Sequence, residues 1–254
     1  YFSPVKEPNY FNTDMHIPSR MSSNEYYKLF ANAQKQHTVI GEASTRYLCS
    51  KVAILNILKN QPEAKFIAIV RNPLELAPSL HQHLVFNGNE PLADFSQAWD
   101  AGLDRESGRG IPRFCRDRDS IIYANMCLLG NQVSRMFEFV REDYRKIILF
   151  DDLVSEPQKT FLNVLNFLDV DSDFSPDYSI YNAARIRKSK LLAQILLASS
   201  RFRNIFGIQR GFGIITKLNK MNTLEKKQTN ISPETIRLMS SYFKNDIKKL
   251  GKLL

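Results

Sequence analysis

Runs of apolar residues along the chain predict three β-strands. The run Phe66–Val70 is rich in β-branched residues and lacks polar alternation, which is typical of a strand covered on both faces in a parallel sheet. Separate apolar runs lie at Val39–Gly41 and at Ile147–Phe150. These three segments are the candidate strands of one sheet.

Apolar residues spaced three and four apart predict helices between and after these strands. Such patterns cover Lys51–Asn60, Leu129–Glu142 and Thr160–Leu168, and a last helix begins with a cap at Ser232. Alternating strands and helices indicate right-handed crossovers and a parallel sheet. We therefore expect an α/β fold, formed by a single domain over residues 1–254 with a central parallel β-sheet flanked by helices.

A basic side chain stands where the strand Phe66–Val70 ends. Asn72 can cap the free amides of a following helix and Pro73 tolerates the first helical position, so a helix is expected directly after Arg71. Ligands of open parallel sheets bind beyond the carboxyl ends of the strands. Arg71 is thus placed to hold an anionic ligand, or to pair with a neighbouring acid such as Glu75, and its position alone favours neither.

Composition narrows the choice of partners. The chain has 254 residues, of which 43% are hydrophobic and 24% charged, and its formal net charge is +9. This charge favours nucleotide phosphates, acidic or sulfated substrates, nucleic acid or a membrane surface. No apolar run is long enough to span a membrane and no nucleic-acid recognition motif occurs, so we expect neither a membrane span nor a nucleic-acid partner. Three widely spaced cysteines predict free thiols in a reducing compartment.

Six motifs follow one another in a characteristic order. They are VKEPNYF, GEASTRYL, IVRNPLELAPS, GNEPLADFSQAW, LFDDLVSEPQKTFLNVLNFLDV and NAARIRKS. Together they resemble the sulfotransferases that depend on 3′-phosphoadenosine 5′-phosphosulfate (PAPS), in particular the bacterial and heparan-sulfate-type branch. The resemblance covers nearly the whole chain and implies a P-loop-containing sulfotransferase-like fold. It also implies sulfuryl transfer from PAPS to a hydroxyl of a carbohydrate, lipid or other small-molecule acceptor, leaving adenosine 3′,5′-bisphosphate (PAP), without a metal.

The resemblance implies which residues hold the donor. Arg71 and Ser79 correspond to the arginine and serine that bind the 3′-phosphate, and a guanidinium with a hydroxyl donor suits a phosphate chemically. Pro78 removes a hydrogen bond if it lies within a helix. It therefore either breaks the helix locally and aims the Ser79 hydroxyl, or weakens the likeness to the family. A basic loop of the family implies a further contribution to donor binding from Arg185, Arg187 and Lys188. Residues 102–120, punctuated by Gly and Pro, are expected to form a solvated loop.

The resemblance also implies an acceptor side. Glu7, in EPNYF, matches the glutamate that acts as the general base on the acceptor hydroxyl; the alternative is a loop glutamate paired with Lys6. Tyr10, Phe11 and Tyr47 are expected to belong to the core or to line the substrate pocket, and His83 is a further candidate for acceptor contact. Related enzymes often have a lysine after the glutamate of GEASTRYL, but here that position is Ala43, so the role of that lysine cannot be carried over.

Part of the family pattern is not present in the sequence. A phosphate loop that holds the 5′-phosphosulfate does not precede Val5, and no G-x-x-x-x-G-K-[ST] motif occurs. We expect the N-terminal strand and this loop upstream of Tyr1. The alternative is a catalytically inactive sulfotransferase-like protein that binds polyanions or nucleotides. The adjacent Asp151 and Asp152 are interpreted as architectural rather than metal-binding, and the free cysteines and the resemblance favour the bacterial cytoplasm as the location.

Overall fold

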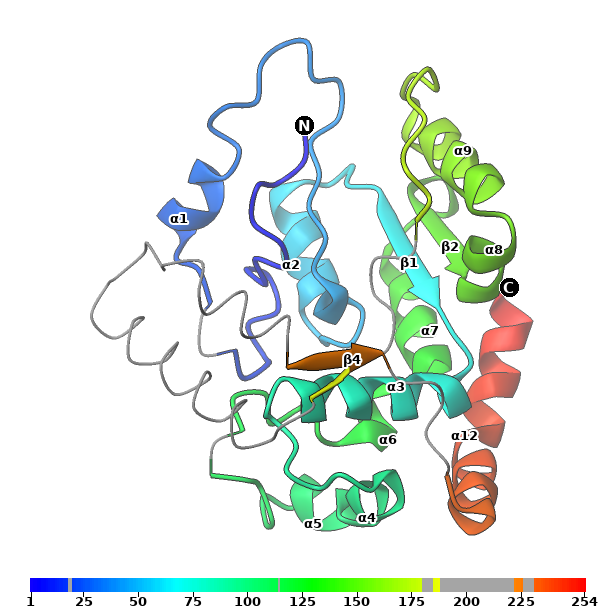
Figure 1. The fold of residues 1–254 in the computed structure, drawn as a ribbon. Coiled ribbons are helices and arrows are strands. Elements are labelled where there is room, and N and C mark those ends of the chain that lie inside the picture. The colour runs from blue at the N-terminus through cyan, green and yellow to red at the C-terminus, as the bar shows by residue number, and fades with distance from the viewer. Residues whose placement is uncertain (18–19, 114, 180–184, 188–221, 226–230) are drawn as a thin grey trace. The chain divides into compact units, whose positions relative to one another are not determined.

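The computed structural model describes residues 1–17, 20–113, 115–179, 185–187, 222–225 and 231–254 (Figure 1). These residues fall into two compact units, which are described separately. Unit 1 takes Tyr1–Glu75, Asn125–Ser179 and Met239–Leu254; unit 2 takes the described residues of Leu76–Ala124 and Ile180–Leu238.

Two parallel strands form the sheet of unit 1. Strand β1 (Phe66–Val70) pairs with β2 (Arg145–Leu149), and Ala68 lies opposite Ile147. Their arrows point the same way in Figure 1. Two of the predicted strands and their parallel arrangement are therefore confirmed. The third predicted strand, Val39–Gly41, is not a full strand. Among the described residues this segment contributes only an isolated bridge from Gly41 to Phe2.

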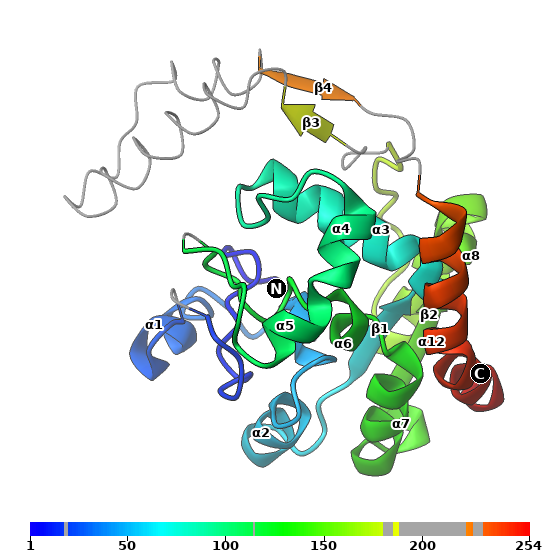
Figure 2. The same ribbon diagram turned by 90° about the horizontal axis from the view of Figure 1, so that it is seen from below.

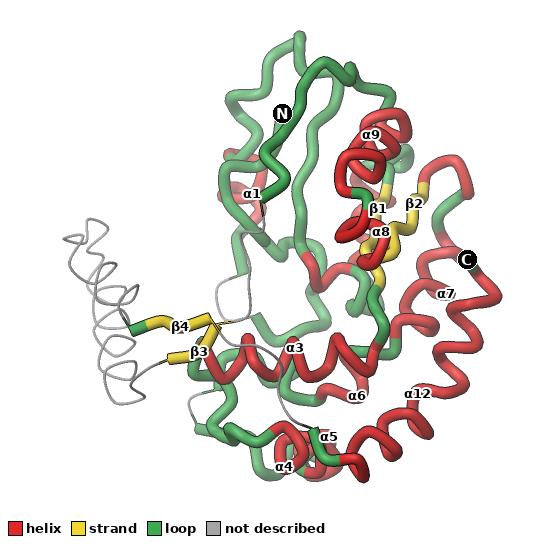
Figure 3. The backbone as a smooth tube through the Cα atoms, turned by 45° about the vertical axis from the view of Figure 1, so that its right-hand side comes forward, coloured by secondary structure: helices red, strands yellow, loops and turns green. Residues whose placement is uncertain are grey.

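Helices flank the two strands of unit 1. Ile54 of α2 and Met136 of α7 pack with Ala68 of β1 in one buried cluster. Figure 3 shows α8 and α9 beside the strands, and the Phe167 ring of α9 lies 5.7 Å from the Lys146 ammonium of β2. The helices wholly within unit 1 are α1 (Ser23–Lys28), α2 (Ala53–Asn60), α7 (Leu129–Phe139), α8 (Phe150–Ser155) and α9 (Pro157–Leu168), with short 3-10 turns at Thr45–Tyr47 and Glu142–Tyr144.

The burial of β1 differs between its two faces. Ala68 and Val70 are 8% and 1% exposed, whereas Ile67 and Ile69 are 39% and 51% exposed. Successive side chains of a strand point to opposite faces, so the cluster with α2 and α7 buries one set. The expectation that both faces of this strand are covered is therefore wrong for the described residues.

A buried carboxylate joins α7 to the last helix, α12 (Pro233–Leu253), which belongs to unit 1 from Met239 onward. The Asp246 carboxylate accepts hydrogen bonds from the amides of Gly130 (2.7 Å) and Asn131 (2.8 Å) at the start of α7, and Lys249 donates to the Asn131 side chain at 2.7 Å. Figure 2 shows the two helices side by side. An acid at a helix N-terminus satisfies amides that have no partner within the helix.

Unit 2 has a small aromatic core. The rings of His81, Phe95 and Tyr123 contact one another edge to face, with centroids 5.4 to 5.8 Å apart. Three helices contain residues of both units: α3 (Pro73–Phe86), α6 (Tyr123–Met126) and α12. The other described elements of unit 2 are α4 (Phe95–Asp100), α5 (Gly102–Glu106) and the antiparallel strands β3 (Arg185–Arg187) and β4 (Thr223–Glu225).

A buried ion pair stabilises unit 2. Arg105 donates from Nη1 and Nη2 to the two carboxylate oxygens of Glu90, at 2.6 and 2.9 Å, and the Tyr123 hydroxyl donates to the same carboxylate at 2.8 Å. Both charged side chains are almost fully buried. The predicted solvated loop over residues 102–120 is therefore wrong at its start, where α5 carries Arg105 into the interior.

The α/β class, with a parallel sheet and flanking helices, is confirmed. The extent of one domain over residues 1–254 stays a prediction. All three cysteines are free thiols, as predicted. In the part of the chain that the structure describes, no helix has both the length and the apolar character needed to cross a lipid bilayer.

Candidate active site

Arg71 lies at the carboxyl end of β1, where α3 begins. The Asn72 side chain accepts a hydrogen bond from the Leu74 amide at 3.0 Å, and the helix starts at Pro73. The predicted cap and helix start are confirmed. The sequence thus puts a guanidinium beside a helix N-terminus, where the helix dipole favours anions.

The Arg71 guanidinium is held by two neighbours. Its Nε and Nη2 atoms donate to one oxygen of Glu75, at 3.2 and 2.9 Å, and its centre lies 4.5 Å from the centroid of the Phe150 ring. The two charged side chains are 28% and 54% exposed. The pairing with Glu75 that the sequence suggested is therefore present. The other carboxylate oxygen of Glu75 and the Nη1 atom of Arg71 take no part in it.

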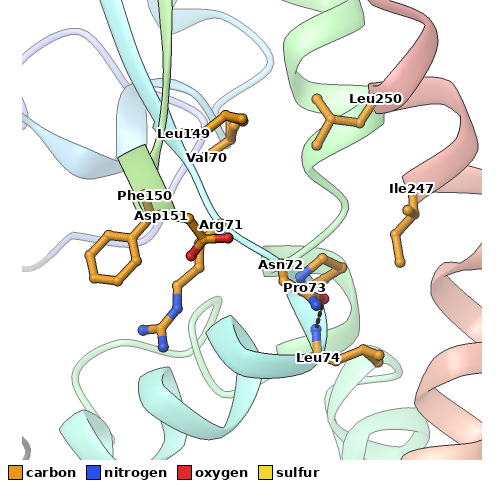
Figure 4. Close-up of a pocket in the computed structure, with 10 residues that line it drawn as sticks. All are labelled: Val70, Arg71, Asn72, Pro73, Leu74, Leu149, Phe150, Asp151, Ile247 and Leu250. Carbon is orange, nitrogen blue, oxygen red and sulfur yellow. Dashed lines mark hydrogen bonds between the residues drawn. The ribbon is translucent and has the colours of Figure 1, made fainter. Parts of the chain in front are cut away.

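A pocket of about 230 Å³ borders Arg71 and is mostly apolar. In Figure 4 the Arg71 side chain runs beside the Phe150 ring and away from Ile247 and Leu250. The pocket is lined by Val70, Arg71, Asn72, Pro73, Leu74, Leu149, Phe150, Asp151, Ile247 and Leu250. Its position beyond the ends of β1 and β2 agrees with the expected ligand-binding edge of a parallel sheet.

Ser79 is exposed on α3, which continues through Pro78. A local break of the helix at this proline was one of the two alternatives, and it does not occur. The proline leaves the Leu74 carbonyl without its usual amide partner, but the helix goes on to Phe86. Arg71 belongs to unit 1 and Ser79 to unit 2, so their joint binding of one phosphate stays a prediction.

The predicted basic cluster lies only partly within the described residues. Arg185 and Arg187 are the end residues of β3, opposite Glu225 and Thr223 of β4. Lys188 lies outside the described residues. The contribution of these three residues to donor binding stays a prediction.

Glu7 stands in a constrained turn of unit 1. It is half-buried, its φ angle is +52°, and its amide donates to the Ala43 carbonyl at 3.2 Å. Among the described residues no ion pair joins its carboxylate to Lys6, so the structural alternative for Glu7 is not supported. A carboxylate without a fixed partner is available to accept a proton.

The aromatic candidates near Glu7 belong to one packed cluster. Tyr10 stacks on Tyr26 with centroids 4.4 Å apart, and Phe11 contacts both Tyr26 and Tyr47 edge to face. Phe11 is buried, while Tyr10 and Tyr47 are half-buried. This packing agrees with a place in the core or in a pocket wall, and their contact with an acceptor stays a prediction.

Glu42 is the centre of a hydrogen-bonded group to which the sequence gave no role. Its carboxylate accepts from the hydroxyls of Tyr47 (2.6 Å), Ser44 (2.8 Å) and Tyr26 (3.3 Å). Burial, helped by the Glu42 charge and its hydrogen bond, raises the pKa of both Tyr47 and Tyr26, so each remains a donor. The motif GEASTRYL drew attention to Glu42 and Tyr47, whereas no local pattern indicated Tyr26.

The remaining candidates lie apart from this group. His83 is exposed on α3 in unit 2, where a ring nitrogen is 2.9 Å from the Asn87 amide nitrogen, so its acceptor contact stays a prediction. Asp151 and Asp152 are exposed in the first turn of α8. Within the described ranges, no group of three or more His, Cys, Asp or Glu side chains could hold a metal ion.

Among known proteins, no family model and no curated protein matches this chain. Among solved structures, a sulfotransferase from Alicyclobacillus acidocaldarius is similar with a TM-score of 0.61 and 23% identity, over 85% of this chain and 88% of that one. The sulfotransferase domain from the curacin biosynthetic pathway aligns with a TM-score of 0.38 and 13% identity, over 87% of this chain and 67% of that one. The first likeness confirms the predicted sulfotransferase-like fold.

Proposed function

We propose that this protein is a sulfotransferase that moves a sulfuryl group from PAPS to the hydroxyl of a carbohydrate, lipid or other small-molecule acceptor. The observation that carries the proposal is the position of Arg71, at the carboxyl end of a parallel strand and the start of a helix, in a chain with a sulfotransferase fold. That position combines a guanidinium with the positive end of a helix dipole, which together suit a nucleotide phosphate, and the Phe150 ring packs against the guanidinium.

In this proposal Arg71 and Ser79 bind the 3′-phosphate of the donor, assisted by Arg185, Arg187 and Lys188. The 3′-phosphate separates PAPS from ATP and other common nucleotides, so a dedicated arginine gives selectivity as well as affinity. The pairing with Glu75 is compatible with this role, because it is a partly exposed contact that an anion can replace. The phosphosulfate loop expected upstream of Tyr1 stays a prediction.

Glu7 is the proposed general base. As the acceptor oxygen bonds to sulfur, the bond between sulfur and the phosphate oxygen of the donor breaks, and the hydroxyl proton moves to the Glu7 carboxylate. PAP and the sulfated acceptor are the products. Glu7 is better suited to this step than Glu42, because the Glu42 carboxylate already accepts three hydroxyl donors whereas no hydrogen bond to the Glu7 carboxylate is seen among the described residues.

Transfer of label from radiolabelled PAPS to a panel of carbohydrate, lipid and alcohol acceptors tests the proposal. The full-length protein, with the expected phosphosulfate loop, is expected to sulfate at least one acceptor class, and Glu7→Gln is expected to lower kcat by about 10²–10⁴-fold. Glu63→Gln is the matched control, since Glu63 is an exposed loop residue of the same unit. Sulfation that is unchanged in Glu7→Gln would remove Glu7 from the mechanism, and a lack of transfer to every acceptor would contradict the function.

A further inference from the structure

The turn that carries Glu7 is bound along its whole length by the segment 43–47. The Glu7 amide donates to the Ala43 carbonyl at 3.2 Å, and the Asn9 amide donates to the Ser44 hydroxyl at 3.1 Å. The Tyr47 hydroxyl accepts from the next two amides of the turn, those of residues 10 and 11, at 3.1 and 3.4 Å. Pro8 has no amide hydrogen, so each backbone donor of residues 7–11 has a partner in this one segment.

This turn needs external support because its backbone is strained. Glu7 and Asn9 both have positive φ angles, of +52° and +50°, although neither is glycine. Such conformations cost on the order of 1–3 kcal/mol each and persist only where the surroundings impose them. The Asn9 side chain donates to the Glu7 carbonyl at 2.8 Å and accepts from the Asn12 side chain at 3.3 Å, and the Asn56 side chain donates to the Phe11 carbonyl at 2.9 Å. The partners of the backbone amides of the turn all come from residues 43–47.

Glu42 in turn fixes the orientation of the two hydroxyls that accept hydrogen bonds from these amides. Ser44 and Tyr47 each donate their hydroxyl hydrogen to the Glu42 carboxylate, so their lone pairs face the amides of the turn. The raised pKa of Tyr47 keeps this phenol protonated and the pattern of donors and acceptors unchanged at neutral pH. One carboxylate thereby sets the orientation of both side chains that hold the turn.

We propose that Glu42, acting through Ser44 and Tyr47, is the positioning group that holds the Glu7 carboxylate where it accepts the proton of the acceptor hydroxyl. This inference rests on the proposed function. A general base works only within hydrogen-bond reach of the proton, and a misplacement of about 1 Å can lower a rate about 10²-fold. Tyr47 and Ser44 are therefore positioning residues, and Glu7 alone of this group takes the proton.

Replacement of Tyr47 by Phe tests the positioning role against a close control. Tyr47→Phe keeps the ring and removes one of the two hydroxyls that join Glu42 to the turn. Tyr27→Phe makes the same change at an exposed tyrosine of the same aromatic cluster, whose hydroxyl donates to Asn60 at 2.9 Å. Amide hydrogen exchange of the folded full chain is measured first, because it needs neither donor nor acceptor.

In Tyr47→Phe, the amides of Tyr10 and Phe11 are expected to exchange about tenfold faster, which corresponds to the loss of an ordinary hydrogen bond. Tyr27→Phe is expected to leave both rates unchanged. Equal exchange in Tyr47→Phe and the wild type would overturn the inference that this hydroxyl holds the turn, whatever the activity of the protein.

Steady-state kinetics of Tyr47→Phe in the wild-type and the Glu7→Gln backgrounds then distinguish a positioning role from a general loss of structure. Tyr47→Phe is expected to lower kcat about tenfold to 10²-fold with the KM for PAPS unchanged. In the Glu7→Gln background the same change is expected to alter kcat by less than about twofold, because no base remains to be positioned. Equal losses in both backgrounds would overturn the positioning role. If the wild type transfers no sulfuryl group, both the proposed function and the positioning role are contradicted. The hydrogen-exchange result still shows whether the Tyr47 hydroxyl holds the turn.

Discussion

The Arg71 guanidinium and the Glu75 carboxylate are four residues apart and paired at 2.9 Å, at the edge of the sheet where the proposed donor phosphate binds. The pair is partly exposed, and such pairs contribute about 0–1 kcal/mol. A phosphate that takes the guanidinium therefore replaces a weak interaction with a stronger, charge-assisted one. In the proposed site, Glu75 competes with the anion and keeps Arg71 in place when no anion is bound.

Glu75→Gln is expected to strengthen binding of PAP. Loss of the competing carboxylate removes at most about 1 kcal/mol of pairing, so Kd should fall by up to about fivefold. Calorimetry of wild type and variant at one ionic strength measures the difference. Glu63→Gln, an exposed glutamate away from Arg71, should leave the Kd unchanged. Weaker binding in Glu75→Gln would mean that the carboxylate supports the anion site instead of competing with it.

Arg105→Met is expected to destabilise the protein strongly. It leaves the buried Glu90 carboxylate without its cation, which typically costs about 3–5 kcal/mol. Arg109→Met is the matched control, because the Arg109 and Asp104 side chains form an ion pair that is 71% and 62% exposed. That change should cost less than about 1 kcal/mol. Urea unfolding of the two variants measures both costs, and similar values would show that burial of the Glu90 pair has no energetic consequence.

Acid should lower the stability of the protein through His81. Burial lowers the pKa of this histidine below its ordinary value of 6.5. Its Nε2 lies 2.9 Å from the Leu92 carbonyl oxygen, so the neutral ring carries its hydrogen on Nε2. The unfolded chain therefore binds more protons than the folded one once the pH drops below about 6.5, and the free energy of unfolding falls with pH until the folded pKa is reached.

His81→Gln keeps an amide donor at this position but cannot titrate. Its free energy of unfolding should therefore depend less on pH between about 7 and 5 than that of the wild type. His83→Gln, two residues along the same helix and exposed, should retain the wild-type dependence. Parallel profiles for the wild type and His81→Gln would show that His81 is not the source of the acid sensitivity.

Gly130→Ala should disrupt the contact between α7 and α12. A Cβ atom at Gly130 would come within 2.1 Å of the Asp246 backbone oxygen, so one of the helices must move. We expect a loss of about 1–3 kcal/mol, as for other overpacked sites. Gly251→Ala provides the contrast, because no atom lies within 4 Å of the added group and alanine favours a helix by up to about 1 kcal/mol. Thermal unfolding of the two variants compares them directly, and a Gly130→Ala protein as stable as the wild type would contradict the close contact.

The parts of the fold that depend on local chemistry could be predicted from the sequence. The apolar runs of β1 and β2 and the caps at Asn72 and Ser232 are recognisable within a few residues of the chain, and all four are present. The strand predicted at Val39–Gly41 is only an isolated bridge, because three apolar or small residues do not show whether a partner strand is available.

Interactions between distant residues could not be predicted in this way. The Gly and Pro residues of segment 102–120 predict a solvated loop around Arg105, whereas the partner of Arg105 in the structure, Glu90, is 15 residues away. The hydrogen bond from Tyr26 to Glu42 likewise spans 16 residues and leaves no periodic signal. Such pairs depend on how the elements pack, which patterns of hydrophobicity do not report.

Arg71 is proposed to belong to a site for the 3′-phosphate of the donor. Calorimetric titration of the full-length protein with PAP, beside AMP and ADP, tests this role for the wild type and for Arg71→Ala. PAP is expected to bind more tightly than AMP or ADP, and this preference is expected to be lost in Arg71→Ala while the fold is retained. Equal binding of the three nucleotides, or a preference for PAP that survives in Arg71→Ala, would contradict the proposed role of Arg71.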